Sequence, residues 1–193
     1  MKKTPFLYSL FFSSLIFSSL AWASDAPQIR IDTSMGAIEL ELNTKAAPKT
    51  VENFMRYARE GFYNGTVFHR VIKNFMIQGG GFTPDFMQKT VRPPVPNEAF
   101  NGLKNDRGSI AMARTMDPHS ATAQFFINTV NNDFLNFRDK SVQGWGYTVF
   151  GKVAKGMDVV DRIQNVTTGE GGPFDQDVPQ PLVIINKVEI IRE

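Results

Sequence analysis

A single arginine lies inside a run of bulky apolar residues that ends in three consecutive glycines. The run is FHRVIKNFMIQGGGF, over residues 68–82. Successive side chains of a strand point to opposite faces, so an extended chain here would place Phe68, Arg70 and Ile72 on one face. Burying an unpaired charge is costly, so Arg70 needs either a carboxylate partner or an open cleft. The segment therefore predicts either a structural ion pair or a binding surface with an apolar wall and one fixed cation.

The remaining apolar residues predict many short strands and two helices. Strands are expected over 28–33, 37–42, 66–72, 75–79, 107–113, 124–130, 148–153 and 182–191. One helix should begin at Pro48 and end at a left-handed cap on Gly61, and a second should cover 156–165. Residues 83–106 and 167–181 are rich in proline or glycine and are expected to form loops. This order of elements fits an antiparallel barrel or a sandwich, and periodicity alone does not choose between them.

The first 23 residues have the pattern of a secretory signal peptide. Two lysines precede a short apolar run rich in serine, and Ala21-Trp22-Ala23 supplies a cleavage site. A transmembrane anchor is the alternative, but the run is short and broken by serines. We expect residues 1–23 to be a cleaved signal peptide and 24–193 to form a single domain. The expected location is the periplasm, with extracellular release as the second choice.

Composition limits the partners of the mature chain. There is no cysteine, so no disulfide forms even in an oxidising compartment, and packing must provide stability. Removing Lys2 and Lys3 from the 21 basic side chains leaves 19, which equals the 19 acidic ones. A neutral chain without a Lys/Arg run gives no basis for binding nucleic acid, or a membrane after signal cleavage. The sequence does not indicate an exposed apolar surface that could form an interface between subunits, so a monomer is expected.

Patterns of metal, phosphate and hydrolytic chemistry are missing from the sequence. His69 and His119 are the only histidines and lack a spacing such as HExxH, so no metal site is expected. His69 should be buried and hydrogen-bonded on the strand face opposite the arginine. The glycine triplet lacks the Gly-Lys-Ser/Thr of a phosphate loop and predicts a tight turn. There is no G-x-S-x-G elbow, which leaves a histidine–serine hydrolase as a minor alternative.

Four segments together resemble the cyclophilin family of peptidyl-prolyl cis/trans isomerases. They are FHRVIKNFMIQGG at 68–80, GSIAMA at 108–113, TAQFFI at 122–127 and VFGKVAKGMDVVD at 149–161. The resemblance covers about residues 28 to 191 and implies a mostly β fold, a closed eight-stranded antiparallel barrel capped by two helices. Side chains fill the interior of such a barrel, so the substrate groove is expected on its outside. The resemblance also implies an enzyme that speeds rotation of X–Pro bonds without a cofactor.

The resemblance implies roles for individual residues as well. Arg70 would be the catalytic cation, since guanidinium stays charged at any working pH. Phe75, Met76, Phe126 and Leu135 would line a pocket for the proline ring. Gln78 and Gln124 would bind the substrate backbone and orient the arginine, and Ala113 and Arg114 would offer main-chain groups to the residues before the proline. Taken singly, each apolar residue is also consistent with ordinary core, and each glutamine with satisfying barrel backbone.

Three positions depart from the common family pattern. Phe134 stands where tryptophan is frequent, Tyr147 where histidine is frequent, and Ala-Arg-Thr-Met at 113–116 where Ala-Asn-Ala-Gly is frequent. Both Phe134 and Tyr147 are still expected at the binding surface. The changes predict weak binding of cyclosporin and an altered sequence preference. The expected partners are proline-containing polypeptides, unfolded or partly folded secreted proteins. The alternative is a chaperone or adaptor of the same fold with little turnover.

Overall fold

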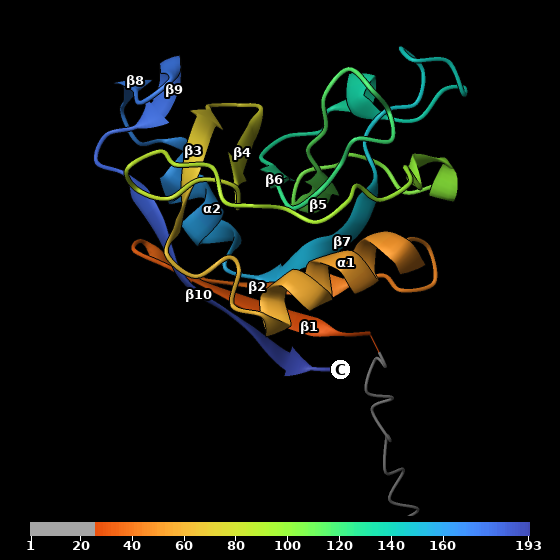
Figure 1. The fold of residues 1–193 in the computed structure, drawn as a ribbon, viewed down its shortest axis with the longest axis horizontal. Helices are drawn as coiled ribbons and strands as arrows, with labels where there is room; N and C mark the ends of the chain where they lie inside the picture. The colour runs from red at the N-terminus through yellow and green to blue at the C-terminus, as the bar shows by residue number, and fades with distance from the viewer. Residues whose placement is uncertain (1–25) are drawn as a thin grey trace, which may run out of the picture.

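The structure is a computed structural model that describes residues 26–193. Eight strands form a closed antiparallel barrel in the order β1-β10-β3-β4-β6-β5-β7-β2 (Figure 1). Their bounds are β1 Gln28–Thr33, β2 Gly36–Leu42, β3 Thr66–Ile72, β4 Met76–Gly79, β5 Ser109–Met112, β6 Phe125–Asn128, β7 Val149–Lys155 and β10 Val183–Arg192. Strand β1 pairs with both β10 and β2, which closes the ring. The eight-stranded barrel implied by the family resemblance is confirmed, and the expected signal peptide lies outside the described residues.

Two helices, α1 (Pro48–Arg59) and α2 (Met157–Gln164), pack onto the core of the barrel. Both were predicted, with Pro48 at the start of α1 and Gly61 in the left-handed region just after its end, at φ 64°. Phe54 of α1 reaches into the barrel, where its ring lies 5.5 Å from that of Phe125 and 5.2 Å from that of Phe150. The interior is therefore filled with side chains, which leaves the outer surface for binding. Neither helix of residues 26–193 has the length and apolar character needed to span a bilayer.

The predicted loop over 167–181 is wrong, because this stretch forms a hairpin. Strands β8 (Thr168–Gly171) and β9 (Phe174–Pro179) pair only with each other and lie beside β3 at the upper left of Figure 1. Glycines interrupt the alternation of apolar and polar residues, so periodicity gave no strand signal. The hairpin is stabilised by residues that are not part of it, since the ring of Phe174 lies 5.3 Å from that of His69 and 5.2 Å from that of Phe82.

The proline-rich segment 83–106 is an ordered connection, as expected, with a single bridge from Phe82 to Gln88 and a 3-10 turn, η1, at Ala99–Asn101. Its order comes from a buried carboxylate. Glu98 accepts hydrogen bonds from the backbone N–H of Lys49 at 3.2 Å and from both the N–H and hydroxyl of Thr50, at 2.9 and 2.7 Å. These groups belong to the first turn of α1, whose own N-cap, Ala47, has no side-chain acceptor. The connection therefore caps the helix.

A bulge in β3 corrects the predicted placement of Phe68. On β4, Gly79 pairs with Phe68 and the adjacent Gln78 pairs with Arg70, so β3 has one extra residue at His69. A bulge of this kind shifts the alternation by one, so Phe68 packs in the core while Arg70 remains partly exposed. Gly79 is needed opposite the bulge, because a Cβ there would lie 3.0 Å from both the Phe68 ring and the Val67 carbonyl oxygen.

Candidate active site

The alternation of side chains on β4 and β6 builds an apolar surface on the outside of the barrel. Ile77 and Phe125 belong to the main core, whereas their neighbours Met76 and Phe126 belong to a second buried cluster. That second cluster is completed by Ala111, Leu135 and Val149. Its members come from β4, β5, β6, β7 and the short 3-10 helix η2 (Asp133–Leu135). The barrel wall thus separates the main core from the floor of an outer pocket.

This pocket has a volume of about 110 Å³ and brings together most of the side chains expected at the site. Nine of the eleven predicted residues line it: Arg70, Phe75, Met76, Gln78, Ala113, Arg114, Phe126, Leu135 and Tyr147. They are far apart in the sequence and reach the pocket from several strands and loops. Six of the nine residues are apolar or aromatic, and the others contribute two guanidinium groups and one carboxamide. Such a lining fits an apolar ring flanked by peptide groups.

The two remaining predicted residues, Gln124 and Phe134, border the pocket. Gln78 donates from Nε2 to Oε1 of Gln124 at 3.0 Å. The ring of Phe134 stacks on that of Phe75 with centroids 5.6 Å apart, and 68% of the residue is exposed. Phe134 therefore extends the apolar wall outward into solvent.

Arg70 has a carboxylate neighbour that the sequence did not reveal. Its Nε lies 3.7 Å from Oδ2 of Asp177, and the Arg70 side chain is still 43% exposed. Arg70 thus has both of the environments that the sequence offered as alternatives, a carboxylate partner and an open cleft. Asp177 lies on β9 with φ 68°, a left-handed conformation uncommon for residues other than glycine. No periodicity or motif in the sequence indicated Asp177, because it lies in the hairpin whose sequence predicts a loop.

A network of buried asparagines fixes the pocket from behind. Asn132 donates from Nδ2 to the Phe75 carbonyl at 2.9 Å and to Asn128 Oδ1 at 2.7 Å. Asn105 donates to the Leu135 carbonyl at 3.1 Å and accepts from Asn128 at 3.2 Å. These bonds hold the main chain at two residues that line the pocket. The network was not predicted, since isolated asparagines in loops give no pattern that distinguishes them from turn residues.

The segment after β5, which was predicted to offer main-chain groups to the substrate, makes hydrogen bonds within the protein. The N–H of Ala113 donates to the Gln124 carbonyl at 2.9 Å and is therefore occupied. The Arg114 side chain donates from Nε to the Gly146 carbonyl at 2.9 Å and from Nη1 to that of Thr115 at 2.9 Å. Its guanidinium also lies 4.6 Å from the centre of the Tyr147 ring. Arg114 thus contributes a fixed charge to the pocket.

His69 is buried, as predicted, in an aromatic environment. It is 3% exposed and packs against both Phe82 and Phe174, with ring centroids 4.7 and 5.3 Å away. Within residues 26–193 its Nδ1 has no hydrogen-bond partner. Burial lowers the pKa of His69 to about 4, and the neighbouring charge of Arg70 acts in the same direction, while a hydrogen bond to the backbone of Val67 opposes them. The imidazole is therefore neutral at pH 7 and stabilises the hairpin as an apolar ring does.

Comparison with known proteins agrees with this geometry. Residues 28–190 match the family described as cyclophilin type peptidyl-prolyl cis-trans isomerase/CLD. The chain is 59% identical to peptidyl-prolyl cis-trans isomerase B of Escherichia coli (strain K12), over 84% of this chain and 98% of that protein. It is 50% identical to peptidyl-prolyl cis-trans isomerase A of Dickeya dadantii, over 92% and 91%. A crystal structure of a Cryptosporidium parvum cyclophilin type isomerase matches with a TM-score of 0.70 and 27% identity, covering 87% of this chain and 99% of that one.

Proposed function

Because this chain belongs to the cyclophilin-type peptidyl-prolyl cis-trans isomerases, we propose that the pocket on the outside of its barrel binds the proline of the X–Pro bond that it isomerises. The activity itself, peptidyl-prolyl cis-trans isomerisation, follows from the family. The observation that supports this location is the convergence of Arg70 with Phe75, Met76 and Phe126 on one small cavity. An apolar cavity of this size suits a proline ring, and the cation lies at its edge.

The reaction requires no bond to break. The X–Pro peptide bond rotates slowly because its C–N bond has partial double-bond character, with a barrier of about 18–20 kcal/mol. A catalyst must bind the twisted amide better than either planar form. As the amide twists, its nitrogen regains a lone pair and becomes a hydrogen-bond acceptor. A fixed cationic donor beside the ring then stabilises the transition state more than the ground state.

Arg70 is the residue that we assign to this role. Its guanidinium donates hydrogen bonds and stays charged at all working pH values. A charge-assisted hydrogen bond contributes about 1.5–3 kcal/mol, which corresponds to roughly one to two powers of ten in rate. The rest of the acceleration would come from holding one flank of the peptide, through the carboxamides of Gln78 and Gln124, while the other flank rotates.

The test of this assignment is the rate of X–Pro exchange measured by NMR on a short blocked peptide, with Arg70→Ala compared to Arg30→Ala. The two arginines are matched, since each side chain is 43% exposed and each lies near one aspartate. We expect Arg70→Ala to lose most of the turnover at nearly unchanged melting temperature, and Arg30→Ala to remain active. Near-normal exchange by a folded Arg70→Ala protein would contradict the assignment.

We further propose that the enzyme acts in the periplasm on secreted proteins as they fold. The support is the signal-peptide pattern of residues 1–23, which precedes the segment matched to the family. Expression of the full chain in a bacterial host, followed by fractionation and mass spectrometry, tests the proposal. Cleavage after Ala23 should give a periplasmic protein that begins at Ser24. An uncleaved protein in the cytoplasm or membrane would contradict it.

A further inference from the structure

We propose that Arg114 makes this isomerase selective for an acidic residue directly beside the proline. This inference rests on the proposed function, because it takes the pocket to be where the X–Pro segment binds. Arg114 lines that pocket together with Arg70 and Phe126. A side chain adjacent to the proline in the bound peptide would lie within reach of the pocket rim, so a fixed charge there would discriminate among neighbouring residues.

The Arg114 side chain is held in place before any substrate arrives. Its Nε and Nη1 donate to the carbonyl oxygens of Gly146 and Thr115, both at 2.9 Å. The guanidinium plane is also supported by the ring of Tyr147, 4.6 Å away. The loop that carries it is braced in turn, because the N–H of Thr115 donates to the hydroxyl of Ser120 at 2.9 Å. A side chain ordered in this way loses little further entropy when it binds an anion.

The charge of Arg114 is not neutralised by the protein. Among residues 26–193, no carboxylate forms an ion pair with it, whereas Arg70 has Asp177 at 3.7 Å. The nearest acid along the loop, Asp117, accepts a hydrogen bond from the N–H of His119 at 2.8 Å. The residues that line the pocket include two arginines and no acid. The pocket rim therefore has an excess of positive charge that a peptide carboxylate would complement.

One edge of the Arg114 guanidinium also remains available for a hydrogen bond. In the described part of the chain, the hydrogen bonds of Arg114 use Nε and Nη1, while Nη2 has no acceptor. A carboxylate is the natural acceptor for this remaining donor, because guanidinium–carboxylate pairs combine charge with directional hydrogen bonds. The competing explanation is that Arg114 only braces the loop through the carbonyl groups of Gly146, Thr115 and Met116. A residue that only braces the loop would not make the rate depend on the charge of the substrate. Measuring the rate for peptides of different charge therefore distinguishes the two explanations.

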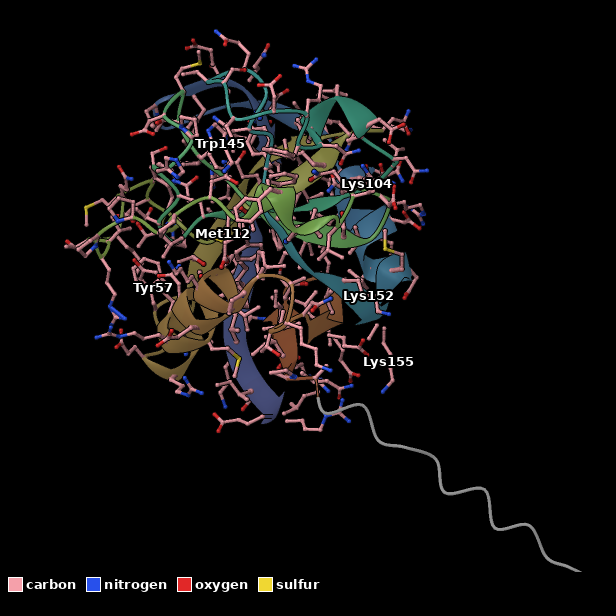
Figure 2. The ribbon with its side chains drawn as sticks, turned by 90° about the vertical axis from the view of Figure 1, so that its right-hand side faces the viewer. Tyr57, Lys104, Met112, Trp145, Lys152 and Lys155 are labelled. Carbon is pink, nitrogen blue, oxygen red and sulfur yellow. The ribbon has the colours of Figure 1, made fainter. Side chains whose placement is uncertain are left out.

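Blocked tetrapeptides with glutamate, glutamine or lysine on either side of the proline provide the test. We expect kcat/KM from NMR exchange to be about fivefold higher for glutamate than for glutamine on at least one side, as for a partly exposed ion pair. The preference should weaken as salt is raised. Arg114→Gln should bring the ratio close to one. Lys155→Gln, which removes a positive charge at the end of the barrel away from Trp145 (Figure 2), should leave the ratio unchanged.

The salt response and the peptide series are measured on the unmodified protein, so they decide the matter even if Arg114→Gln folds poorly. Equal rates for glutamate and glutamine peptides, by an enzyme that isomerises both, would overturn the selectivity while leaving the proposed function intact. A preference that persists in folded Arg114→Gln would likewise overturn the assignment to Arg114. Failure to isomerise any peptide would overturn the proposed function and this inference with it.

Discussion

At the scale of single residues, Phe134 is predicted to extend the binding surface beyond the pocket. It stacks on Phe75 and is otherwise exposed, so it forms an apolar wall with no polar group. The family resemblance places tryptophan at this position in members that bind cyclosporin well. An indole adds both area and an N–H donor, and such a donor usually finds a partner in a complex.

We therefore predict that Phe134→Trp tightens cyclosporin binding by about 1 kcal/mol, or roughly fivefold in Kd, as expected for one added hydrogen bond. Isothermal titration of both proteins measures the change. Phe100→Trp is the matched control, because Phe100 is also exposed, at 58%, but its ring packs near Phe137 and Trp145 and not on the pocket residue Phe75. Equal affinity of the Phe134→Trp and unmodified proteins would show that Phe134 does not contact the ligand.

At the scale of elements, the β8–β9 hairpin brings Asp177 next to Arg70. Its Oδ2 lies 3.7 Å from Nε of Arg70, close enough to orient the guanidinium by charge. We predict that Asp177→Asn lowers kcat/KM by up to about fivefold, mainly through kcat, because the pair is partly exposed. Asparagine tolerates the left-handed backbone of this position, so the hairpin should stay folded.

Steady-state measurements on Asp177→Asn and on the exposed neighbour Asp175→Asn test this role. The second variant removes the same charge from the same strand without contact to Arg70, and we expect it to be as active as the unmodified protein. A rise in activity on removing Asp177 would mean that the carboxylate competes with the substrate for Arg70. That result would contradict an orienting role.

The cap of α1 depends on a residue from a different element. Glu98 is 7% exposed and satisfies the first turn of the helix through three hydrogen bonds. We predict that Glu98→Ala lowers the free energy of unfolding by about 2 kcal/mol, since it removes a helix cap and charge-assisted bonds. This corresponds to a fall in Tm of about 4–8 °C for a chain of this length. Glu52→Ala, an exposed change on the same helix, should alter Tm by much less; equal shifts would refute the capping role.

At the scale of the whole molecule, local sequence patterns predicted most of the helices and strands. They predicted few of the contacts between residues that are far apart in the sequence. The ends of α1 followed from Pro48 and Gly61, because both act through local backbone geometry. The prediction that Phe68 shares a strand face with Arg70 was wrong. A bulge depends on how β3 pairs with β4, and the sequence of β3 alone does not encode this pairing. Closure of the barrel and the position of the pocket came from the family resemblance rather than from periodicity. Asp177 reaches Arg70 only through tertiary packing, so no local signal could identify it.

The global stability of the fold should depend on the protonation of His69. Burial lowers the pKa of His69 from 6.5 to about 4 in the folded protein, so the folded state holds the neutral form and the unfolded chain takes up the proton first. The stabilisation from this group is therefore complete above pH 6.5 and is lost progressively as the pH falls towards 4. Its full extent is about 3 kcal/mol, from the difference between the two pKa values.

Denaturant unfolding at several pH values between 4 and 7 measures this loss. The exposed carboxyl groups with lowered pKa, such as those of Asp158 and Asp161, start from 3.8 and so affect stability mainly below this window. His69→Phe keeps an aromatic ring packed against Phe82 and Phe174 but cannot be protonated, so its free energy of unfolding should fall much less between pH 7 and pH 4. Replacing the exposed His119 by glutamine should preserve the full acid dependence. If the free energy of unfolding of His69→Phe falls as much between pH 7 and pH 4 as that of the unmodified protein, then the acid sensitivity of the barrel arises elsewhere and not from protonation of His69.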